Sequence, residues 1–209
     1  MTSYRFHDIA NLRQEIAVAA ARMIAEEGTS YDLAKRKAAR LILGNSRITG
    51  EILPDNTTIE NEVRLYNELF LAHTQPARLQ HLRVISFQLM KKLEMFNPYL
   101  AGAVMNGTGG EYSDIHLQLF TENVKEVEIF LLNQRIDFNV SESPHFRGKS
   151  HVIETIHFVW QGEAVHMTVY DPDDIRRQNK FFGAHYERAN LTELQRLIDE
   201  SDKIDKNKF

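Results

Sequence analysis

The chain has 209 residues, of which 43% are apolar and 26% are charged, and these values are typical of a globular protein with one large or two small domains. Its formal net charge of −4 gives no general attraction for nucleic acid or for anionic membranes. The chain contains no cysteine, which excludes disulfide bonds, thiolate nucleophiles and cysteine-based zinc sites. The polar N-terminus has no signal-peptide pattern and no apolar run has the length of a membrane span, so we expect a cytoplasmic protein without membrane contact.

The first 97 residues are predicted to be almost wholly helical, because apolar side chains recur there at the three- and four-residue spacing of amphipathic helices. The pattern predicts four helices, over residues 9–27, 29–43, 57–70 and 76–96. The third is expected to begin with a capping box at Thr57-Thr-Ile-Glu60. Asn97-Pro98 ends the fourth, because the residue before a proline disfavours helical backbone. We therefore expect residues 1–97 to form a helical region.

Residues 98–209 have a different character, with alternating and β-branched segments between shorter helical ones. We expect strands at 99–105, 113–120, 136–140, 151–160 and 163–170, a polar loop at 141–150, and helices at 124–134 and from Asn190. Gln161-Gly162 is a tight hairpin signal. The predicted fold class is α/β in the broad (α+β) sense, with the helical region packed on a small mixed β-sheet.

The segment from Ser113 to Phe120 carries the first candidate site. Asp114, His116 and Gln118 share one face of the predicted strand, and three apolar side chains share the other. A strand needs only one apolar face to be held in a sheet. A row of an acid, an imidazole and an amide on the second face is therefore either a solvated surface or a functional site.

The order of elements around this segment resembles the nucleotidyltransferase-fold superfamily, the DNA polymerase beta-like group. In that superfamily a small-residue pair ends the first strand, and about ten residues later the next strand carries two acids around an apolar residue. Gly102-Ala103 and Asp114-Ile115-His116 stand at these positions, and the resemblance extends over residues 78–171. It implies a mixed sheet of that type, a nucleotide or other phosphorylated ligand, a divalent metal (Mg²⁺ or Mn²⁺), and transfer of a nucleotidyl group to an unknown acceptor.

Several positions depart from the family pattern. Ala103 replaces a small polar residue that touches phosphate in family members, and His116 replaces the second metal-binding acid. The family pattern takes a third acid from a later strand. On the last predicted strand the polar face carries His166 and no carboxylate, so the sequence does not identify this third acid. The resemblance then implies that Asp114 is the main metal ligand and that His116 is a second ligand or a general base. The alternative is a catalytically inactive member that works as a binding or regulatory module.

A histidine-centred metal site is a second candidate. Asp114, His116 and His166 could meet across two strands, with His151 or His157 from a neighbouring strand. A carboxylate with imidazoles is a normal ligand set for a transition metal, whereas Mg²⁺ prefers oxygen. The alternative is that these imidazoles form hydrogen bonds with their neighbours.

The glycine-containing loop is a third candidate. Gly107, Thr108, Gly109 and Gly110 follow Gly102 closely, and consecutive backbone N–H groups in such a loop can bind phosphate. The loop lacks the Lys-Ser/Thr of a P-loop. A flexible connection between strands is the alternative interpretation.

A basic helix face is a fourth candidate. Lys35, Arg36, Lys37 and Arg40 lie in a helix pair that resembles the start of TetR-type helix-turn-helix regulators, which implies contacts with DNA phosphates. Residues 45–56 predict a loop where the recognition helix is expected, and the same side chains are also typical of a solvated face.

A serine hydrolase is not expected, because the chain has no Gly-x-Ser-x-Gly sequence and its serines lie in predicted caps and loops.

Overall fold

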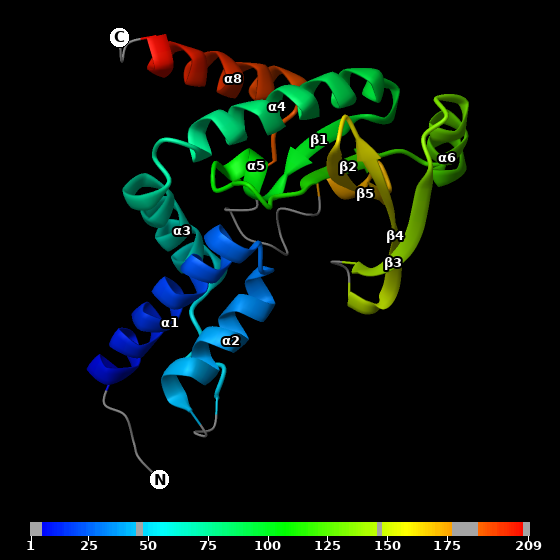
Figure 1. Ribbon diagram of the computed structural model, residues 1–209. Coiled ribbons are helices and arrows are strands. Elements are labelled where there is room, and N and C mark those ends of the chain that lie inside the picture. Colours follow the sequence, from blue (N-terminus) through cyan, green and yellow to red (C-terminus); the bar gives the residue numbers. More distant parts are fainter. Residues whose placement is uncertain (1–5, 45–47, 146–147, 177–187, 207–209) are drawn as a thin grey trace. The chain divides into compact units, whose positions relative to one another are not determined.

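The computed structural model describes residues 6–44, 48–145, 148–176 and 188–206 (Figure 1). The chain divides into two compact units. The first comprises residues 1–75 together with 110–112, and the second comprises residues 76–109 and 113–209. None of the helices in the described part of the chain combines the length and the apolar character that crossing a bilayer requires.

The first unit is helical and contains α1 (Phe6–Glu27), α2 (Tyr31–Leu43) and α3 (Asn56–Phe70). Alanines supply much of its core, so α1 can pack closely against both α2 and α3. The buried residues are Ile16, Ala17, Ala20, Ala21, Ala34, Ala38, Ala39, Ile52, Ile59 and Val63. Ile52 lies in the segment before α3, and the others recur one, three or four residues apart within each helix, which is the spacing of one helix face.

Two helix ends in this unit can be compared with their predicted signals. Gly28 ends α1 with a φ of +65°, a backbone conformation that favours glycine, and its N–H donates to the Ile24 carbonyl at 3.1 Å. The predicted capping box at Thr57 is wrong, because Asp55 is the N-cap of α3 and its carboxylate accepts from the Thr58 N–H at 2.7 Å. An aspartate two residues before Thr57 satisfies the first turn, so the helix begins earlier than expected.

The second unit contains a five-stranded mixed sheet. Its strands are β1 (Pro98–Ala101), β2 (Ile115–Phe120), β3 (Phe138–His145), β4 (Gly148–Trp160) and β5 (Glu163–Tyr170), in the spatial order β1-β2-β5-β4-β3. The β2–β5 pair is parallel and the other pairs are antiparallel. The helical elements of this unit whose bounds lie within the described residues are α4 (Gln75–Lys92), the 3₁₀ turn η1 (Glu94–Phe96), α5 (Gly102–Asn106), α6 (Val124–Asn133) and α8 (Leu191–Lys206).

Helices α4 and α8 lie side by side in Figure 1, and hydrogen bonds from Gln80 to the Ile198 carbonyl and from Arg83 to Ser201 join them. Their apolar side chains share one core with the apolar face of the sheet, which includes Leu117 and Met167. Although α4 was expected to belong to the helical region of residues 1–97, it packs in the core of the second unit. Neighbouring helices along a chain can bury their apolar faces in different cores, and sequence order alone does not reveal this.

The mixed α/β fold is confirmed, and the local differences have simple causes. Gly102, with a φ of +70°, ends β1, so residues 102–106 turn into α5 instead of extending the strand. The predicted loop at 141–150 is wrong over its described part, because β3 continues to His145 and β4 begins at Gly148. The hairpin at Gln161-Gly162 is as predicted, and both residues have positive φ.

Candidate functional site

One face of the sheet carries a row of polar side chains. The register places His116 opposite His166, and His166 opposite His157 on the next strand. Asp114 immediately precedes β2 on the same side of the alternation as His116. Side chains directly opposite each other on paired strands lie close enough to interact, so the register brings these groups into contact.

The three residues predicted from separate segments as the acid–imidazole site converge. Nε2 of His166 lies 2.8 Å from Oδ2 of Asp114. The rings of His116 and His166 stack, with centroids 5.0 Å apart and planes at 24°. Gly102 lies beside the ring of His116, since a Cβ at this position would meet Cδ2 of His116 at 3.4 Å. The first strand end, Asp114, His116 and His166 therefore meet at one place.

A fourth imidazole extends the row. Nδ1 of His157 lies 2.6 Å from Nδ1 of His166, and the two rings meet edge to face. Nε2 of His157 lies 2.6 Å from Oγ of Ser141 on β3. His157 was one of two alternatives named from the sequence. The side chain of the other, His151, is outside the described residues.

Sequence reasoning missed Ser141, because it placed this residue in a loop. A signal was present. The alternation of polar and apolar residues that begins at Phe138 continues with Val140 apolar and with Asn139 and Ser141 polar. Glu142 stands where the next apolar residue would be, and Pro144 follows, so the pattern stops and the strand was concealed. Edge strands tolerate a proline, and β3 is an edge strand with a register shift between Pro144 and His145.

The surroundings favour the neutral form of two imidazoles in this row, those of His116 and His157. Desolvation, and secondarily the neighbouring His166, lower the pKa of His157. The same two causes, in the same order, lower the pKa of His116, although nearby Asp114 acts in the opposite direction. His116 keeps an exposed surface, so its desolvation is partial. Asp114 is 46% exposed and His166 is 28% exposed, so solvent reaches this end of the row.

Three comparisons, with protein-family models, with curated proteins and with solved structures, found no match to this chain.

The donor set does not fit the magnesium chemistry of the nucleotidyltransferase pattern. It offers one carboxylate, Asp114, where the pattern has three, and Mg²⁺ prefers oxygen ligands. Both ring nitrogens of His166 are engaged in hydrogen bonds, to Asp114 and to His157. Within the described ranges, no group of three or more His, Asp or Glu side chains is arranged to hold a metal ion. The predicted metal ligands Asp114, His116 and His166 lie together, but His166 is hydrogen-bonded to Asp114 and the ring of His116 stacks on that of His166.

The backbone of the glycine loop is largely engaged internally. The N–H groups of Gly107 and Gly109 donate to the Ala103 carbonyl at 3.1 and 2.8 Å. Both the N–H and the hydroxyl of Thr108 donate to Oδ1 of Asn106. A phosphate at these N–H groups would have to replace existing hydrogen bonds. Gly110 belongs to the first unit, whereas Gly107, Thr108 and Gly109 belong to the second.

The basic face of α2 is mostly solvated. Arg36, Lys37 and Arg40 are exposed, and Nζ of Lys35 donates to Oδ1 of Asn56 at 3.0 Å. These side chains thus lie on the surface of α2, and no observation in the described residues links them to nucleic acid.

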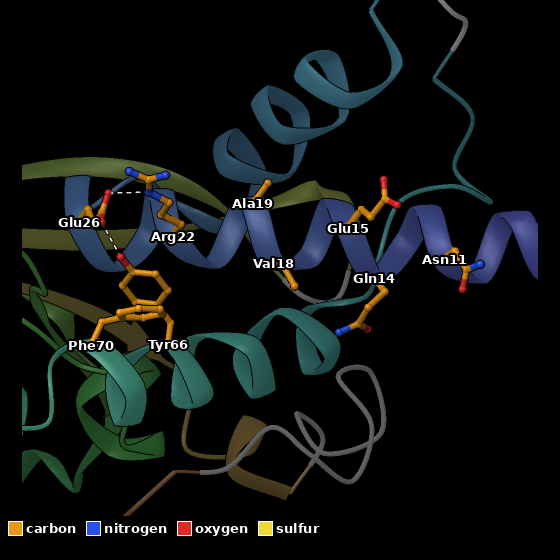
Figure 2. A pocket seen from close by; sticks show the side chains of 9 residues that line it. All are labelled: Asn11, Gln14, Glu15, Val18, Ala19, Arg22, Glu26, Tyr66 and Phe70. Carbon is orange, nitrogen blue, oxygen red and sulfur yellow. Dashed lines mark hydrogen bonds and ion pairs between the residues drawn. The ribbon is translucent and has the colours of Figure 1, made fainter.

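A groove runs between α1 and α3 in the first unit (Figure 2). Val18, Tyr66 and Phe70 supply its apolar wall, and a polar cluster stands at one end. There Glu26 accepts from Arg22 at 2.9 Å and from the hydroxyl of Tyr66. The hydrogen bond from Tyr66, and then that from Arg22, lower the pKa of Glu26. These groups bond to one another, and the residues predicted as the site from the sequence lie elsewhere.

Proposed function

We propose that this protein is nucleotidyltransferase-like and binds a nucleotide or another phosphorylated ligand. The binding site is the part of the polar sheet face formed by Gly102, Asp114, His116 and His166. One observation carries the proposal. Segments that the family pattern assigns to the site, the end of the first strand, the acid-bearing second strand and a later strand, meet through the β2–β5 register and the contact of Gly102 with His116. The position where the pattern expects a third acid is taken by His166.

One carboxylate with neighbouring imidazoles is better suited to binding a phosphorylated ligand than to transferring a nucleotidyl group. Three carboxylates repel phosphate unless cations neutralise them, whereas one carboxylate with neutral imidazoles carries much less negative charge. His116 is exposed, and among the described residues neither of its ring nitrogens has a hydrogen-bond partner, so it can donate an N–H to a phosphate oxygen. Gly102 has no Cβ, so the backbone at the end of β1 can lie close to the ring of His116.

The direct test is calorimetric titration of the purified protein with each of the four nucleoside triphosphates, first with a chelator and then with Mg²⁺ or Mn²⁺. We expect saturable binding of at least one nucleotide. His116→Ala should weaken it about tenfold, which is the usual effect of losing one hydrogen bond to a charged group. Ser143→Ala is the matched control, because Ser143 lies on β3 and bonds to Thr155 instead of to a histidine. Failure of every nucleotide to bind in all conditions would refute the proposal.

The same samples distinguish binding from transfer. We expect no release of pyrophosphate and no nucleotidyl adduct on the protein with either metal. Release that disappears in Asp114→Ala would assign a transferase activity to the site instead. Elemental analysis of untagged protein tests the remaining metal prediction, and a stoichiometric metal that is lost in His116→Ala would establish it.

A further inference from the structure

The polar face of the sheet holds a continuous row of hydrogen bonds that nucleotide binding does not require. It runs from Asp114 through His166 and His157 to Ser141, and its three contacts measure 2.8, 2.6 and 2.6 Å. The row crosses four adjacent strands or their ends, in the order β2, β5, β4 and β3. It begins at a carboxylate and ends at an exposed hydroxyl group.

The carboxylate sets the direction of donation along the row. An ionised carboxylate only accepts, so His166 donates its Nε2–H to Asp114. A neutral imidazole has a single N–H, which leaves Nδ1 of His166 as an acceptor, and His157 must donate Nδ1–H to it. Nε2 of His157 then carries a lone pair, and the hydroxyl of Ser141 donates to that nitrogen. Each donor in the row has one acceptor.

This arrangement prepares the hydroxyl of Ser141 for proton loss. In the tautomer that the row requires, the lone pair at Nε2 of His157 faces the hydroxyl of Ser141 at 2.6 Å and is available as a base. When that nitrogen takes a proton, the positive charge can be shared with His166 and lies next to the Asp114 carboxylate. A nucleophile, a base bonded to it and a group that orients the base are the three components of an activated serine.

We propose that Ser141 is a nucleophile, activated through His157, His166 and Asp114, that attacks activated carboxylic esters. Oγ of Ser141 bonds to the ester carbonyl carbon while its proton passes to Nε2 of His157. The bond from that carbon to the alcohol oxygen then breaks, and His157 returns the proton to the leaving alcohol. Water, deprotonated by the same nitrogen, hydrolyses the acyl-serine and regenerates the hydroxyl of Ser141.

The substrate class follows from the size of the expected effect. A positioned general base contributes about 10²–10⁴-fold to a rate. Such an acceleration is adequate for esters whose leaving alcohol is acidic, such as aryl esters. Ser141 and His157 are the catalytic residues in this proposal, whereas His166 and Asp114 act through His157 and are positioning residues. The activity requires no nucleotide, so it stands or falls separately from the proposed binding function.

A neighbouring row on the same face provides a matched control. Ser143 on β3 lies 3.3 Å from Oγ1 of Thr155, which lies 3.3 Å from Oγ1 of Thr168. This row contains hydroxyl groups only and has neither a base nor a carboxylate. Ser143 is therefore a serine on the same strand and the same face that lacks the proposed activation.

The experiment combines labelling with kinetics, both without nucleotide. A fluorophosphonate probe forms an Oγ–P bond with an activated serine and releases fluoride, and we expect mass spectrometry to locate the adduct on Ser141. Hydrolysis of p-nitrophenyl acetate should be about 100-fold slower for Ser141→Ala, and for His157→Asn, than for the wild type, and unchanged for Ser143→Ala. Circular dichroism of each variant confirms that it is folded.

The positioning role of Asp114 requires a readout beyond lost activity. Asp114→Asn removes the charge that stabilises the protonated imidazoles, so the midpoint of the pH–rate profile should move to lower pH. Equal hydrolysis by the wild type and Ser141→Ala, or an adduct on any other residue, would overturn the proposal. An unchanged pH midpoint in Asp114→Asn would overturn the role assigned to the carboxylate.

Discussion

The two faces of the sheet in the second unit are built from the same strands, yet they serve different purposes. On one face, residues such as Leu117 and Met167 are fully buried against α4 and α8. On the other face, the residues one position earlier, His116 and His166, stack on each other next to solvent. Since neighbouring residues of a strand point to opposite sides, one strand can stabilise the fold and position a site at once. Substitutions one residue apart should separate these two purposes.

The largest effect is expected on the apolar face. Leu117→Ala removes a side chain that is 1% exposed in the main core, and we expect it to lower the free energy of unfolding by about 2–5 kcal/mol. Urea denaturation measures this change. The neighbouring substitution His116→Ala should cost less than about 1 kcal/mol, because this residue is exposed. Similar losses for the two variants would contradict the division of the faces.

A charged pair links α4 to the start of β5 on the apolar side. Arg78 donates to both carboxylate oxygens of Glu163, with the second contact at 2.6 Å, and the pair is 21% and 14% exposed. The hydrogen bond from Arg78 lowers the pKa of Glu163.

We expect Arg78→Ala to lower the free energy of unfolding by about 2 kcal/mol, because it leaves a carboxylate without its main partner in a half-buried position. Denaturation in urea provides the measurement. Arg196→Ala is the control, since its pair with Glu200 is 70% and 53% exposed and should contribute less than about 0.5 kcal/mol. Equal losses in the two variants would show that burial does not strengthen the pair with Glu163.

As the pH falls, the stabilising contribution of the histidines on the polar face should be lost at a higher pH than that of the pair between Arg78 and Glu163. The pKa values of His116 and His157 are lower in the folded protein than the ordinary value of about 6.5, so the unfolded chain binds protons more readily. Their stabilising contribution is therefore complete above about pH 6.5 and is lost as the pH falls through the folded pKa values. The contribution of Glu163, whose pKa is also lowered, is lost only at pH values below about 4.3.

Urea denaturation at a series of pH values between 7 and 5 measures this loss. His157→Gln should reduce the dependence of stability on pH in this interval, because a carboxamide does not titrate. A pH dependence identical to that of the wild type would show that His157 does not contribute.

The smallest effect is expected in the hydroxyl row. Ser143→Ala removes one neutral hydrogen bond at 3.3 Å, so the free energy of unfolding should change by less than about 0.5 kcal/mol. Thermal unfolding monitored by circular dichroism is sufficient to test this. A loss greater than that of Arg78→Ala would mean that this row supports the sheet and is not a neutral control.

Local sequence signals account for much of the fold. The alternation from Ser113 to Phe120 correctly separated the polar from the apolar face of β2, and Gln161-Gly162 correctly predicted the hairpin. Asn190 and Glu193 exchange hydrogen bonds at the start of α8, as expected for a helix that begins at Asn190. These features depend on residues within a few positions of each other, where the chain geometry leaves few alternatives.

The sequence by itself determined which side chains share a face of each strand and that an acid and an imidazole stand together on β2. Only the tertiary structure decided that His166 lies opposite His116, that Ser141 is on a strand, and that α4 belongs to the core of the sheet. The physical reason is that strand register depends on pairing between distant segments, and a shift of one residue would turn every side chain to the opposite face. The hydrogen-bonded row from Asp114 to Ser141 forms because the registers of the β2–β5, β5–β4 and β4–β3 pairs all turn these side chains to the same face.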